Sequence, residues 1–108
     1  MLYQEFYRYS AECKKWKRKY AKLQNELEDY ERRVCASQGI TDPVVIEQRI
    51  RYVQSNNAYL ASYASKYEFN WKELQRVKSE IIVQHLAKEA FKVEENSEAP
   101  LASSGRYQ

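Results

Sequence analysis

Hydrophobic residues in the first third of the chain recur at alternating intervals of four and three, the spacing of a coiled-coil helix. Residues 1–38 contain no glycine or proline, so one helix from 2 to 37 can carry the whole pattern. We expect one buried seam along this helix, formed by Leu2, Phe6, Tyr9, Cys13, Trp16, Tyr20, Leu23, Leu27, Tyr30 and Val34.

A second seam with the same spacing follows a short interruption. Gly39 is suited to end the first helix because glycine adopts the left-handed conformation freely. Asp42 can cap a second helix that starts with Pro43. The pattern predicts a helical hairpin with a loop at 38–42 and a second helix from 43 to 78, whose seam is Ile46, Ile50, Val53, Asn57, Leu60, Ala64, Tyr67, Trp71 and Leu74.

The two seams also predict an antiparallel register, in which the numbers of facing residues add up to 80. This register places Trp16 opposite Ala64 and centres the hairpin in the loop. The acidic residues around Glu31 then face Arg49 and Arg51. The polar residue within the second seam, Asn57, resembles the buried asparagine that fixes the register of some coiled coils.

Two alternatives remain for the last third of the chain. Asn70 and Glu73 form a capping-box pattern, which favours a third helix that starts there. The seam nevertheless keeps its phase through this point, and we favour a helix that continues to 94. The sequence thus predicts an all-α protein, with one helical domain over 1–94 and a disordered tail over 95–108. The predicted architecture is a long antiparallel helical hairpin of the coiled-coil type with a C-terminal helical extension. A break at Asn70 would fold this extension back into a three-helix bundle.

Composition narrows the possible settings of the protein. No apolar run in the 108 residues approaches the roughly 18 needed to span a membrane, and no secretory signal is visible. Cys13 and Cys35 would lie about 33 Å apart on one helix, too far for a disulfide. Reduced thiols fit an intracellular, most simply cytoplasmic, protein.

The sequence contains no recognisable catalytic set. His85 is the single histidine, and the proposed register places it far from both cysteines. A nucleophilic pair and a multi-histidine metal site are therefore not expected. We expect no cofactor, no metal, no small-molecule substrate and no enzymatic activity.

Cations concentrate between residues 8 and 22. We predict a binding surface for an anionic partner formed by Arg8, Lys14, Lys15, Arg18 and Lys22. The seam residues Trp16 and Tyr20 should be buried and unable to stack on bases, and no acidic residue of the hairpin should neutralise the patch. The patch could contact nucleic-acid phosphates or an acidic protein, or it could be a solvated face.

Apolar residues outside the seams predict a second interaction surface. Tyrosine is common at protein interfaces because its ring is apolar and its hydroxyl is polar. The first helix is too short to cover residues 79–94. The predicted partner-binding residues are Tyr52, Tyr59, Tyr63, Ile81, Ile82, Leu86, Phe91 and Val93.

These features favour a non-enzymatic role. The leading hypothesis is a helical scaffold, adaptor or assembly factor that acts through protein–protein association or self-association. The alternative is a small basic nucleic-acid-binding protein that uses the cations between Lys14 and Lys22, with a net charge of +3 for the whole chain.

Overall fold

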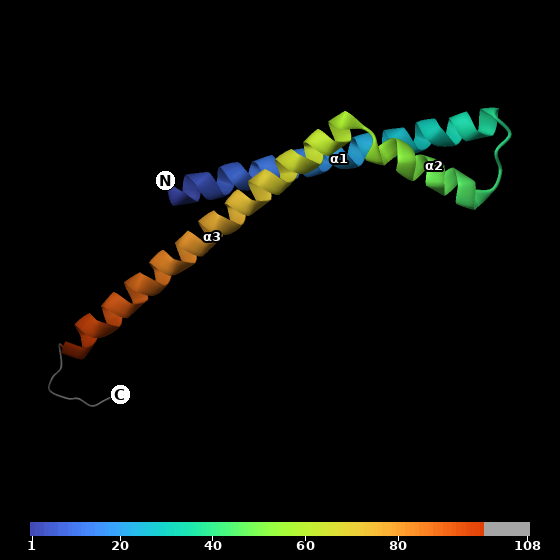
Figure 1. Ribbon diagram of the computed structural model, residues 1–108. Coiled ribbons are helices and arrows are strands. Elements are labelled where there is room, and N and C mark those ends of the chain that lie inside the picture. Colours follow the sequence, from blue (N-terminus) through green and yellow to red (C-terminus); the bar gives the residue numbers. More distant parts are fainter. Residues whose placement is uncertain (99–108) are drawn as a thin grey trace.

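Three helices make up the part of the chain that the structure describes (Figure 1). This structure is a computed structural model, which describes the backbone of residues 1–98 and the side chains of residues 1–92. The helices are α1 (Leu2–Ser37), α2 (Pro43–Ser55) and α3 (Ala58–Glu98). The predicted all-α class is confirmed.

The helices form a long, narrow hairpin (Figure 1). α2 runs back along the C-terminal part of α1, and α3 then packs along the N-terminal part of α1. α3 continues well beyond the start of α1, so its second half projects from the hairpin. The Cα positions extend over 87 × 27 × 15 Å, which agrees with an elongated molecule.

The turn between α1 and α2 forms as its residues predicted. Gly39 has a φ of 75°, and its N–H donates to the carbonyl of Ala36 at 3.1 Å. The N–H of Ile40 donates to the carbonyl of Cys35 at 2.9 Å, which completes a Schellman motif. Asp42 caps α2 by accepting a hydrogen bond from the Val44 N–H at 3.0 Å.

The second helix of the hairpin breaks where continuity was predicted. α2 ends at Ser55, and α3 begins after Asn57, whose Oδ1 accepts a hydrogen bond from the Leu60 N–H at 2.9 Å. The Asn56 side chain donates to the carbonyl of Tyr52 at 2.8 Å. The prediction that Asn57 is a polar residue of a continuous seam is therefore wrong, because it is the N-cap of α3.

The break lets α3 turn a different face toward α1. Asn70 and Val77 are buried, whereas Trp71, which was assigned to the seam, is 45% exposed. The Trp16 ring packs against Tyr63, with ring centroids 5.6 Å apart, instead of facing Ala64. The predicted antiparallel alignment is nevertheless retained to within one residue, as the contacts Trp16–Tyr63 and Glu5–Arg76 show. The assignment of Trp71 to the packed face is wrong, because the break between α2 and α3 changes the phase of α3.

The alternative break at Asn70 does not occur. α3 runs continuously through this residue, and the Asn70 amide donates to the carbonyl of Lys66 at 2.7 Å, within the helix. Residues 79–98 therefore continue α3 in a straight line and do not fold back onto the hairpin (Figure 1). The predicted tail also starts too early, since α3 ends at Glu98, and 99–108 lie outside the described residues.

Candidate interaction surfaces

The projecting part of α3 carries an exposed apolar stripe, which we define as Ile82, Val83 and Leu86. Their exposed fractions are 58%, 64% and 61%, respectively. Phe91, on another side of the helix, is 64% exposed. Ile81 is partly buried beside the start of α1, and the side chain of Val93 lies outside the described residues.

The apolar stripe does not continue the face of α3 that packs on α1. Leu74 and Val77 mark the packed face. At about 100° per residue, the stripe lies roughly 150° around the helix from these residues. The packed face instead continues through the polar residues His85 and Lys88. A longer α1 would therefore leave the stripe uncovered.

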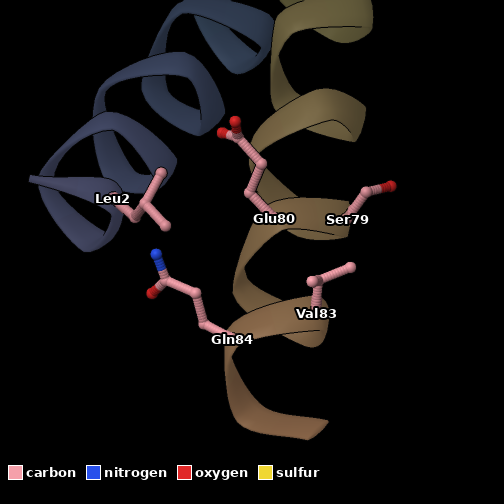
Figure 2. A pocket seen from close by; sticks show the side chains of 5 residues that line it. All are labelled: Leu2, Ser79, Glu80, Val83 and Gln84. Carbon is pink, nitrogen blue, oxygen red and sulfur yellow. The ribbon is translucent and has the colours of Figure 1, made fainter. Parts of the chain in front are cut away.

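Two shallow grooves flank the point where α1 begins. Figure 2 shows one of them, where Leu2 of α1 lies beside Glu80 and Gln84 of α3, with Ser79 and Val83 on the outer side. The second groove connects the α1 terminus to the stripe, and its lining residues are Tyr3, Phe6, Tyr7, Lys78, Ile81 and Ile82. Because Tyr3 and Tyr7 are exposed, the apolar surface extends from the stripe onto α1.

The predicted tyrosine stripe is divided by the helix break. Tyr52 lies in α2 and Tyr59 in α3, and both side chains are exposed. Tyr63 is partly buried against Trp16. The structure therefore leaves Tyr52 and Tyr59 available to a partner but places Tyr63 in the contact between α1 and α3.

The cations form a second surface, around Trp16. Three lysine ammonium groups lie over its indole ring, those of Lys15, Lys19 and Lys66, at 4.7, 5.3 and 4.5 Å from the ring centroid. The indole N–H donates to Glu12 at 3.0 Å. Trp16 and Tyr20 are partly buried, so the prediction of full burial is wrong for both.

Sequence reasoning found part of this cationic surface. Arg8, Lys14, Lys15, Arg18 and Lys22 are all exposed, as a ligand-binding role requires. One acid does approach them, because Glu12 pairs with Lys15 at 3.8 Å. The predicted set of five residues did not include Lys19. Lys66 was expected to add to the patch from the second helix, but its contact with the Trp16 ring was not predicted, because that contact depends on the phase of α3.

Other potentially reactive groups are dispersed. Burial, and then the nearby Glu12 carboxylate, raise the pKa of the Cys13 thiol, which keeps it protonated and a poor nucleophile at neutral pH. His85 is exposed on the projecting part of α3. Within the described residues, no group of three or more histidine, cysteine or acidic residues could hold a metal ion.

Comparison of the chain with protein-family profiles, curated proteins and solved structures finds no match. Among the described helices, none combines the length and the apolar character required to cross a lipid bilayer.

Proposed function

We propose that the protein is a non-enzymatic intracellular scaffold or adaptor, and that it associates with a protein partner through the projecting part of α3. The observation that carries this proposal is the apolar stripe, which is exposed and points away from the face that packs on α1. The two cysteines of the protein, Cys13 and Cys35, are buried and form no disulfide, which suits an intracellular protein.

The energetics of the stripe support an interface. Burial of one such side chain stabilises a complex by about 1.5–3 kcal/mol. Exposed apolar patches rimmed by polar residues are typical of protein–protein contacts. The stripe lies on a long, rigid helix that projects from the hairpin, so a partner could reach it from several directions (Figure 1).

The test is a pair of variants with matched charge. Ile82→Glu with Leu86→Glu introduces two carboxylates into the stripe, whereas Gln84→Glu with His85→Glu introduces two on other sides of the same exposed segment. Complex formation is measured by analytical ultracentrifugation of the purified chain and by photo-crosslinking from position 83, which neither variant changes, in the cells of origin. We expect the stripe variant to weaken association by at least about tenfold, since lost burial of one side chain exceeds about 1.4 kcal/mol.

The matched pair separates an interface from a general effect of charge. The Gln84/His85 variant should associate like the wild type if the stripe is the contact. Equal association of both variants and the wild type would refute the role of the stripe. A monomeric wild type without any crosslinked protein would refute the proposed function.

A further inference from the structure

The cationic surface around Trp16 lies outside the proposed protein-binding stripe. We propose that this surface binds single-stranded nucleic acid, with lysines on the phosphates and aromatic rings against the bases. We call it the basic belt and define it as Lys14, Lys15, Lys17, Arg18, Lys19, Lys22 and Lys66. Its members from α1 lie around most of the circumference of that helix, with Lys14 and Arg18 on the side away from Trp16. The inference does not depend on the proposed scaffold function.

Three like charges converge on the ring of Trp16. The ammonium groups of Lys15 and Lys19 of α1 and Lys66 of α3 all lie within 5.3 Å of the Trp16 centroid. The three ammonium groups repel one another, and the negative face of the indole offsets this repulsion only in part. An anionic ligand would neutralise the cluster. Because its members come from two helices, the hairpin itself creates this arrangement.

Few carboxylates pair with the described cations of the basic belt. Among the described residues, the one ion pair of the belt is Lys15 with Glu12, at 3.8 Å. Elsewhere in the three helices, cations commonly pair with nearby carboxylates, as do Arg32, Arg49, Arg51, Lys72, Arg76 and Lys92. Seven exposed cations with one paired acid are typical of a surface that tracks phosphates.

Aromatic rings lie next to several of these cations. Trp16 and Tyr63 lie 5.6 Å apart, with Lys19 within 6.0 Å of the Tyr63 centroid. A separate groove between α1 and α3 is lined by Tyr20, Ala64 and Tyr67, together with Lys17. Surfaces that combine a cationic path with aromatic rings are typical of single-strand binding, where unpaired bases stack on the rings. An acidic peptide would use the cations but would gain little from stacking.

The experiment uses Trp16 as its own reporter. In a Trp71→Phe chain, Trp16 is the remaining tryptophan. Its fluorescence is followed while oligothymidylate or oligouridylate is added, at salt concentrations from about 50 to about 200 mM. We expect quenching of Trp16 and affinity that falls steeply with salt. A variant that combines Lys15→Gln, Lys19→Gln and Lys66→Gln should reduce the steepness of log affinity against log salt concentration by about 2. Each phosphate contact with a single strand contributes about 0.7 to this slope.

A matched variant controls for the change in net charge. The control variant combines Arg51→Gln, Lys72→Gln and Lys92→Gln, which remove an equal number of positive charges from exposed positions outside the basic belt. This variant should keep the slope of the parent chain, and circular dichroism should show equal helicity for both variants. Equal weakening by the two variants would overturn the proposal, because binding would then depend on net charge alone.

Two further ligands test the class of partner. Polyglutamate that quenches Trp16 and binds as tightly as the oligonucleotides would overturn the proposal in favour of an acidic protein. Duplex DNA that binds as tightly as a single strand of equal length, without quenching, would overturn the stacking role of the rings. Tight, quenching, salt-sensitive binding of the single strands alone would support the proposal.

Discussion

Glu31 is a carboxylate on the buried side of α1, and a partner from α2 compensates its charge. It is 5% exposed, and its Oε2 lies 3.0 Å from Nε of Arg49. The Cys35 thiol donates weakly to the same oxygen at 3.9 Å, and Arg49 also donates to Gln38 at 2.7 Å. This network ties α2 to the end of α1, next to the turn.

We predict that Arg49→Gln destabilises the protein more than Glu31→Gln does. Loss of the guanidinium leaves a carboxylate buried without a counter-charge, whereas glutamine in place of Glu31 leaves a cation that reaches water. Arg49 is 36% exposed in its side chain, so we expect a loss of about 1–3 kcal/mol in the free energy of unfolding, below the value for a fully buried pair. Urea unfolding of both single variants and the double variant measures the coupling between them.

The double variant decides whether the pair acts as a unit. A coupling energy of at least about 0.5 kcal/mol is expected for two groups in direct contact. Additive losses would contradict the role of Arg49 as the counter-charge of Glu31.

Sequence pattern predicted the partners in this network but not their burial. Arg49 was expected opposite the acidic residues around Glu31, and this pairing is confirmed. Arg51 was expected there too, but it pairs with Glu47 of its own helix at 3.4 Å. Tyr30 was assigned to the seam, yet it is 57% exposed while Glu31 is buried. A pattern of apolar spacing cannot identify a buried charge, because the compensation comes from another helix.

At the scale of elements, the break between α2 and α3 determines which residues of α3 are buried. No glycine or proline marks this break. Its signal is instead the run Ser55, Asn56 and Asn57, whose side chains bond to the backbone and so compete with the helix. The seam spacing continues across the run by coincidence, which is why spacing alone favoured continuity. Gly39, Asp42 and Pro43 made the first turn predictable because each has a specific conformational role.

The contribution of the Asn57 N-cap to the stability of the protein can be measured. We predict that Asn57→Ala lowers the free energy of unfolding by about 1 kcal/mol, since the Leu60 N–H loses its acceptor. Gln48→Ala, at an exposed position inside α2, is the control and should change stability by less than about 0.5 kcal/mol. Thermal or urea unfolding followed by circular dichroism compares the two. Equal stability of Asn57→Ala and the wild type would mean that the cap contributes nothing to α3.

At the scale of the whole molecule, the hairpin could be predicted because its turn residues and its seams indicate the same topology. The interaction surfaces could be predicted only in outline. Exposure of Ile82 and Leu86 was predicted from the length of the first helix, but in the structure these residues also lie on a side of α3 that does not continue the packed face. The contact of Lys66 with Trp16 could not be derived, because it depends on the rotation of α3 after a break that the seam spacing does not reveal. Sequence pattern places residues along a helix more reliably than around it when a neighbouring break changes the phase.

The division of α3 into a packed part and a projecting part leads to a prediction for a shortened chain. Leu2 lies in a groove with residues up to Gln84, and every described side chain from 85 to 92 is exposed. A chain that ends at Gln84 therefore keeps the contacts between α1 and α3. We predict that its melting temperature stays within about 4 °C of the full chain, since about 1 kcal/mol corresponds to about 4–8 °C in a protein of this size.

The same shortened chain should lose partner association, because Leu86 is removed from the apolar stripe and the remaining helix end can fray. An unchanged melting temperature together with a loss of association is the result expected of a folded hairpin that carries a separate docking helix. Circular dichroism and analytical ultracentrifugation on the two chains measure these properties independently. A fall in melting temperature of more than about 8 °C would show that the projecting helix packs on the hairpin in solution. That result would contradict the extended arrangement of α3 and would assign its apolar residues to the core of the protein.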